Sequence, residues 1–235
     1  MSKLLNVSSS PHVRCGVSTK NLMYDVAIAM LPATIWGVMQ FGIYSLIVVV
    51  ATVLSCVLSE YLFETLMHKP VTISDGSALV TGMILGLNMP PAIPLWMPIL
   101  GGVFAIIVVK QLYGGLGQNW MNPALAARCF MLISFAQAMT KFTDPVTDAV
   151  ASATPLAAIK AGDTYDLAAM FIGKIPGTIG EVSVIALLIG AAYLLVKKVI
   201  TIRIPAAYIL SFAVFAFIFG QHNINYVLAE VCGGG

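Results

Sequence analysis

The chain has 235 residues, of which 59% are hydrophobic and only 9% are charged, and its mean hydropathy is +0.94. Soluble domains carry about 25% charged residues, so this composition excludes an ordinary soluble domain and makes lipid part of the solvent. The net charge of +2 argues against nucleic acid as a partner, and the four scattered cysteines argue against a zinc or iron–sulfur site, so we expect no metal centre.

Five segments are long and apolar enough to cross a bilayer core of about 30 Å as helices. In chain order they are residues 24–42, 43–66, 95–112, 181–199 and 204–220. Residues 78–89 and 123–139 are shorter and rich in Gly or Pro, which predicts broken half-helices that are buried in protein or line a cavity. Within the first of these, the spacing Gly82-x-x-x-Gly86 predicts close helix packing. A last apolar segment begins near residue 226.

Lysine and arginine residues orient these helices, because short cytoplasmic connections carry an excess of positive charge. Lys197, Lys198 and Arg203 cluster in one short connection. Placing that connection inside puts the N-terminus in the cytoplasm and makes the long loop of residues 141–179 extracytoplasmic.

Few acidic residues lie near membrane depth. Glu60 and Glu64 are one helical turn apart near the cytoplasmic end of the second span, and we expect them to be interfacial and paired with Lys69. Asp75 opens the first half-helix. Capping that helix is its favoured role, and ion coupling is the alternative.

Residues 114–123 read GGLGQNWMNP. The stretch lacks G-x-G-x-x-G and follows no strand, which argues against a dinucleotide site. Asn122 and Pro123 predict a helix N-cap and the first helical residue. A capped N-terminus inside the protein also suits an anionic group such as a phosphate. Arg128, in the same helix, is expected either to face protein, water or an anionic group, or to extend to the cytoplasmic interface.

The segment 148–154 reads DAVASAT and lies in the long loop. By composition alone it is an ordinary loop of small residues. It also fits a modification acceptor, because nothing bulky blocks the Thr154 hydroxyl from a transferase active site. Pro155 removes a backbone donor and restricts Ala153 to extended geometry, which presents Thr154 outside a helix. Asp148 is placed to hold a metal or to orient the segment during such a transfer.

The same segment resembles the flavinylation motif D-x-x-S/T-G-A-T of the RnfD/NqrB family of membrane subunits. Asp148, Ala153 and Thr154 match the motif, and Ala151-Ser152 stands where the usual pattern has Ser-Gly. Three further stretches resemble that family in the same order along the chain. They are SSSPHVRCGVSTKNLMYDVAIAMLPATIWGV, SDGSALVTGMILGLNMPP and YGGLGQNWMNPALAARCF.

The resemblance implies a cofactor and a fold. FMN would be joined through its phosphate to Thr154 by an extracytoplasmic flavin transferase, with Asp148, Ser152 and Ala153 completing the attachment motif. A second, noncovalent flavin is left open. With a flavin implied, the candidate flavin or helix-terminus contacts are Asn119, Asn122 and Arg128. The implied fold is an all-α polytopic membrane protein built as an inverted-repeat bundle with broken half-helices, as in urea channels. Its parts would be a cytoplasmic N-terminal arm, a first five-helix repeat, the extracytoplasmic flavin loop and the start of an incomplete second repeat, at residues 1–23, 24–140, 141–179 and 180–235.

The implied function is that of a flavin-carrying subunit of an Rnf-type electron transport complex, which the short N-terminal arm favours. Such a translocase moves electrons between ferredoxin and NAD and couples them to Na+ or H+ transport. Expected partners are the other Rnf membrane and peripheral subunits, the flavin transferase and the lipid bilayer, in the cytoplasmic (inner) membrane of a bacterium or archaeon. No complete active site is expected in this chain alone. The alternatives are a urea-channel-type solute channel or transporter, and the NqrB subunit of a Na+-translocating NADH:quinone reductase.

Overall fold

The computed structural model describes residues 18–143, 150–151, 171–173 and 175–219, together with residues 227 and 231. Within these ranges the chain is helical apart from one two-stranded antiparallel ribbon, β1 (Phe142–Thr143) with β2 (Val150–Ala151). Three described helical stretches are long and apolar enough to cross a membrane: Thr19–Phe41, Ile43–Leu66 and Trp96–Tyr113. The expectation of a helical polytopic membrane protein is therefore confirmed.

The first two spans are α1 (Thr19–Phe41) and α2 (Ile43–Leu66). Gly42 joins them with a φ of +79°, a conformation that L side chains rarely adopt. The inner face of α2 consists mainly of small and polar side chains: Ser45, Val48, Val49, Thr52, Ser55, Cys56, Ser59, Glu60 and Glu64. Its large apolar residues, such as Leu54, Leu58 and Leu62, are exposed. In soluble proteins the large apolar residues of a helix are usually the buried ones. The opposite arrangement in α2 suits a helix with lipid on its outer face.

Two half-helices occur at the positions that the sequence predicts; the first packs on α1 and α2, and the second packs on the first half-helix and on the third span. They are α3 (Ser77–Leu87) and α5 (Pro123–Ser134). The packing of α3 on α2 is very close: a Cβ added at Gly82 would lie 2.6 Å from the Cα of Val53, and one at Gly86 would lie 3.0 Å from the Cα of Val49. The predicted role of the Gly82-x-x-x-Gly86 pair is thus confirmed.

The third span changes its helical geometry along its length. It begins as α4 (Trp96–Val103), widens into the π-helical stretch η2 (Phe104–Lys110) and tightens into η3 (Gln111–Tyr113). π-helical stretches are rare, and those that occur are mostly single turns within α-helices, frequently at functional sites. Two shorter elements, η1 (Ile73–Asp75) and α6 (Ala136–Met139), precede α3 and follow α5.

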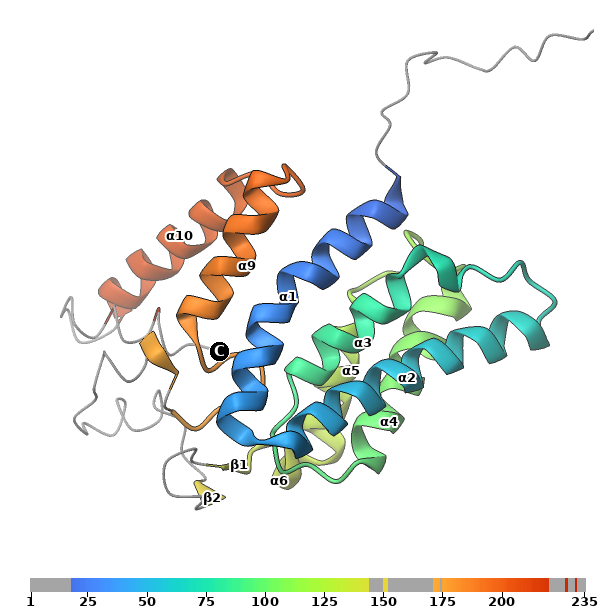
Figure 1. Cartoon of the computed structure of the whole chain (residues 1–235), viewed down its shortest axis with the longest axis horizontal. Helices are drawn as coiled ribbons and strands as arrows, with labels where there is room; N and C mark the ends of the chain where they lie inside the picture. Colours follow the sequence, from blue (N-terminus) through green and yellow to red (C-terminus); the bar gives the residue numbers. More distant parts are fainter. Residues whose placement is uncertain are drawn as a thin grey trace, which may run out of the picture.

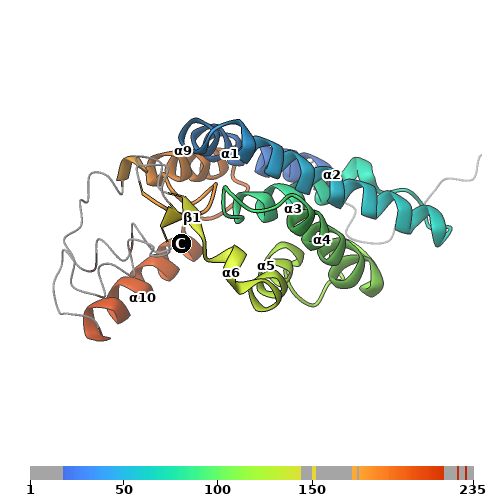
Figure 2. The same cartoon turned by 90° about the horizontal axis from the view of Figure 1, so that it is seen from below.

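The last described helices are α9 (Val184–Val196) and α10 (Arg203–Phe219). The helix α9 is shorter than the span that the sequence predicts at 181–199, whereas α10 agrees closely with the predicted segment 204–220. Figures 1 and 2 show α9 lying along α1, where a Cβ on Gly190 would meet the carbonyl oxygen of Ala29 at 2.3 Å. By contrast, α10 has no buried residue. Of the apolar segment beginning near residue 226, only residues 227 and 231 are described.

The contact between α2 and α3 gives a first prediction. Gly82→Ala should lower the free energy of unfolding by about 1–3 kcal/mol, because its Cβ meets backbone that cannot yield. Gly101→Ala is the matched control, since its nearest neighbours are the flexible side chains of Met131 and Leu85 at 3.3–3.5 Å. Thermal unfolding of the detergent-solubilised protein should show a clearly larger loss for Gly82→Ala. Equal losses would contradict the packing described.

Candidate functional site

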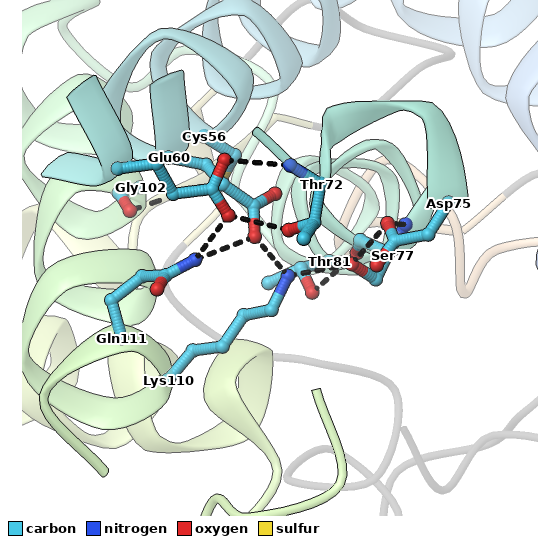
Figure 3. Close-up of polar contacts among 10 residues, drawn as sticks. Cys56, Glu60, Thr72, Asp75, Ser77, Thr81, Gly102, Lys110 and Gln111 are labelled. Carbon is cyan, nitrogen blue, oxygen red and sulfur yellow. Dashed lines mark hydrogen bonds and ion pairs between the residues drawn. The ribbon is translucent and has the colours of Figure 1, made fainter. Parts of the chain in front are cut away.

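A group of charged and polar side chains, all buried except the half-buried Asp75, lies where α2, the start of α3 and the end of the third span meet (Figure 3). We call it the charge cluster, and its members are Glu60, Glu64, Asp75, Ser77, Lys110 and Gln111. Charged side chains at membrane depth are costly and usually functional, so this cluster is the leading candidate site of the described chain.

At the centre of the charge cluster is a buried ion pair between Lys110 and Glu60. The Lys110 Nζ lies 2.6 Å from Glu60 Oε1, and the two side chains are 3% and 0% exposed. Gln111 Nε2 donates a second hydrogen bond to the same oxygen at 2.8 Å. The other oxygen, Glu60 Oε2, is buried and has no hydrogen-bond partner among the described residues. Such an orphaned acceptor costs free energy unless another group satisfies it.

Glu64 lies one turn further along α2 and has its own partners. Its carboxylate accepts hydrogen bonds from the Thr72 backbone N–H at 2.9 Å and from the Thr72 hydroxyl, and a longer one from Gln111 Nε2 at 3.3 Å. Gln111 therefore links the two glutamates, and Thr72 ties α2 to the turn that leads into α3.

Asp75 lies on the opposite side of Lys110. Its Oδ1 accepts from the backbone N–H of Ser77 at 2.8 Å and from the Ser77 hydroxyl at 2.6 Å, which confirms a capping role at the start of α3. The same Ser77 oxygen accepts a 2.6 Å hydrogen bond from Lys110 Nζ. One ammonium group is thus bonded directly to Glu60 and, through one hydroxyl, connected to Asp75.

The expected pairing of Glu60 and Glu64 with Lys69 is wrong, while the expected interfacial position of the two glutamates stays a prediction. Glu60 and Glu64 are 0% and 2% exposed, whereas Lys69 is exposed and lies over the Phe63 ring at 5.2 Å. Lys110 was not predicted as the partner of Glu60 because it lies far from Glu60 in the sequence, at the end of an apolar run. Two features of the sequence could have indicated the pair: a lysine directly after the apolar Val108-Val109, and two glutamates on the polar face of α2.

The two asparagines that the sequence offers as flavin contacts have local roles in the structure. Asn122 caps α5, since its Oδ1 accepts from the N–H groups of Ala124 and Leu125 at 3.0 and 3.4 Å. Asn119 donates to the Met121 carbonyl oxygen at 2.8 Å. The predicted cap with Pro123 at the first helical position is confirmed, and flavin contact by either side chain stays a prediction.

Arg128 faces protein groups, which is the first of the two environments that the sequence predicts for it. Its Nη1 donates to Asn88 Oδ1 at 2.6 Å and to Glu181 Oε1 at 3.1 Å. These partners stand at the end of α3 and just before α9, so one side chain of α5 joins three separate segments. Its two partners, Asn88 and Glu181, line an apolar cavity of about 400 Å³ between α1, α3 and α9.

The attachment motif itself, Asp148, Ser152, Ala153 and Thr154, lies outside the described residues. Its flank is described, because β2 ends at Ala151 and pairs with β1, where Ala151 stands opposite Phe142. Next to β1 a cavity of about 690 Å³ is lined by Met97, Phe135, Gln137 and Lys141, among other residues.

The ion pair gives a second prediction. In sodium-free buffer, Lys110→Met and Glu60→Gln should each lower the free energy of unfolding by about 3–5 kcal/mol, because each leaves a buried polar partner uncompensated. The double variant should lose less than the sum of the two single variants. Additive losses in a double-mutant cycle measured by thermal unfolding would contradict the pairing.

Comparison with known proteins places the chain among membrane subunits. A model of the NQR2, RnfD, RnfE family matches residues 6–235. The D component of the Na(+)-translocating ferredoxin:NAD(+) oxidoreductase complex of Acetobacterium woodii is 46% identical over 231 residues, which cover 96% of this chain and 73% of that protein. The corresponding component of the proton-translocating complex of Clostridium ljungdahlii is 39% identical and covers 92% and 70%. That of the ion-translocating oxidoreductase complex of Methanosarcina acetivorans is 31% identical and covers 95% and 71%. This chain belongs to the NQR2, RnfD, RnfE family.

Proposed function

We propose that this chain is the flavin-carrying membrane subunit of an Rnf-type complex, which moves electrons between ferredoxin and NAD and couples them to Na+ or H+ transport. The charge cluster is the coupling site, and Thr154 carries FMN. Its partners are the other membrane and peripheral subunits of the complex and a flavin transferase. The names of the relatives, which include both sodium- and proton-translocating complexes, support this assignment.

The observation that carries the coupling role is the Glu60–Lys110 pair. It lies between two candidate membrane spans, and one of its carboxylate oxygens has no partner among the described residues. A permanently satisfied structural ion pair would not need that free oxygen. Beside it, a polar cavity of about 310 Å³ is lined by Glu64, Asp75 and Gln111 and by the exposed Lys69. Ions or protons therefore have a polar route to the cluster, which is a common feature of transport pathways.

The flavin assignment rests on the attachment motif, and the described residues beside the motif suit such a group. The cavity next to β1 has the size of small-molecule sites, which span about 300–1,000 Å³. Lys141 would hold the anionic phosphate, Gln137 would hydrogen-bond ring carbonyls, and Met97 and Phe135 would exclude water. When bound there, FMN would supply a one- or two-electron relay.

The proposal also includes the finer architecture and topology. Residues 24–140 would form the first of two inverted five-helix repeats and residues 180–235 the start of the second. The N-terminal arm, residues 1–23, would lie in the cytoplasm and the Thr154 loop outside it. The short half-helices α3 and α5 support this plan, because broken helices in transporter-like folds line the site.

The flavin assignment predicts a fluorescent band at the mass of this chain on a denaturing gel under ultraviolet light, after co-expression with the flavin transferase. Thr154→Ala should lose the band, because the accepting hydroxyl is removed. Thr154→Ser keeps a hydroxyl and should retain at least part of the signal. A dark wild-type band would contradict the proposal and favour the solute-channel alternative.

The coupling assignment predicts that Glu60→Gln uncouples the complex. Membrane vesicles containing this variant should keep the fluorescent flavin band but lose most ion transport driven by electron transfer between ferredoxin and NAD. Tyr208→Phe, on the exposed face of α10, is the matched control and should transport like wild type. Wild-type transport in Glu60→Gln would remove the charge cluster from the mechanism.

A further inference from the structure

We propose that Lys110 is a tethered cation that holds the place of the transported ion, and that a monovalent metal cation of the size of Na+ exchanges with its ammonium group at Glu60. The inference rests on the proposed function, in which the charge cluster couples electron transfer to ion movement. It adds the means by which the cluster stays closed to ions at rest and admits one during turnover.

The bonds of Lys110 provide for such an exchange. Its Nζ is 2.6 Å from Glu60 Oε1 and 2.6 Å from Ser77 Oγ, and Ser77 Oγ is 2.6 Å from Asp75 Oδ1 (Figure 3). The ammonium group therefore lies between two carboxylates on different elements. If it leaves Glu60, it keeps the Ser77 hydroxyl and gains a nearby anionic partner in Asp75, so its displacement does not strand a buried charge.

Glu60 presents the oxygen that an incoming cation would contact first. Its Oε2 is buried without a hydrogen-bond partner among the described residues, and its Oε1 is the atom that Lys110 would vacate. Carboxylate and hydroxyl oxygens are the ligands that hard cations prefer. The described part of the chain contains no group of three or more His, Cys, Asp or Glu side chains arranged to hold a metal ion. A sparse ligand set suits a transported ion, which must bind weakly enough to leave.

The charge balance of the cluster favours an additional cation. Three carboxylates, Glu60, Glu64 and Asp75, share a single buried ammonium group among the described residues. If all are ionised, the cluster is anionic even with Lys110 in place. A monovalent cation at Glu60, with Lys110 moved toward Asp75, brings the formal charge nearer to zero. Uncompensated charge is costly in a low-dielectric interior. Exchange of the ammonium group for a cation keeps Glu60 compensated and is therefore favourable, whereas removal of Lys110 without a replacement is not.

Local backbone geometry fixes where the tether is attached. Lys110 is the last residue of the π-helical stretch η2 and Gln111 the first of η3, and both side chains are buried against the cluster. Lys110 Nζ and Gln111 Nε2 both donate to Glu60 Oε1, and Gln111 Nε2 also reaches Glu64 Oε1. The junction of η2 and η3 therefore supplies the ammonium and the amide that bond the same oxygen of Glu60.

The experiment uses the whole complex carrying Lys110→Met, with thermal unfolding followed at constant ionic strength in either sodium chloride or choline chloride. In choline the variant should unfold at a lower temperature than wild type. Sodium should restore much of that loss, because Na+ takes the vacated position and ligands of the native state stabilise it. Wild type and the control Lys20→Met, which loses an exposed charge on α1, should respond little to the exchange of salts.

A second measurement removes the dependence on stability. The Na+ concentration that gives half-maximal electron transfer between ferredoxin and NAD should fall about tenfold or more in Lys110→Met, if the ammonium occupies the site at least nine-tenths of the time. Lys110→Gln, which keeps a hydrogen-bonding end without charge, should show the same direction and serves if the methionine variant fails to assemble.

The outcomes separate the inference from the proposed function. Equal unfolding of Lys110→Met in sodium and choline, or an unchanged Na+ requirement in both neutral variants, overturns the inference. So does a rescue of Lys110→Met by lower pH in place of sodium, which would mean that a proton replaces the ammonium. Loss of the sodium response in the Glu60→Gln/Lys110→Met double variant supports it. If Glu60→Gln alone still abolishes ion transport, the proposed function survives any of these failures.

Discussion

The interaction on which this structure depends is the buried pair between Lys110 and Glu60. Two opposite charges 2.6 Å apart in a largely dehydrated bundle attract strongly, but each also loses its hydration. The pair is tolerated because neighbouring groups share its charge: Gln111 and Ser77 each bond one member. Residues from α2, α3 and the third span therefore meet at one point, and the packing of the first bundle is arranged around it.

The close contact between α2 and α3 holds this arrangement together. Glycines at 82 and 86 let the backbone of α3 approach α2 at Val53 and Val49. A wider interface would also separate Glu64 of α2 from Thr72, which precedes α3. The small residues of α3 thus help to hold a polar cluster together between α3 and its neighbours. Small residues allow close helix packing at many interfaces in membrane proteins.

The sequence allowed the helices to be predicted better than their contacts. Length and hydropathy located α1, α2 and the third span, and Gly or Pro interruptions located α3 and α5. Local side-chain chemistry predicted the caps by Asp75 and Asn122, because a cap bonds residues adjacent in the chain. The partner of Glu60 could not be predicted this way, since it stands 50 positions away and depends on which face of the third span turns inward. The shortness of α9 was missed for a different reason: apolar composition shows where a helix can extend, not where it ends.

The three-way contact of Arg128 has a consequence for how the protein is made. Chains enter the membrane from the N-terminus during synthesis, so Asn88 is already present when Arg128 emerges, whereas Glu181 follows 53 residues later. During that interval Asn88 is a neutral acceptor for the guanidinium group, and the carboxylate of Glu181 is not yet present. The arrival of the segment before α9 then neutralises it. The first bundle can therefore assemble early with a provisional partner and be completed electrostatically only when the next part of the chain has been translated.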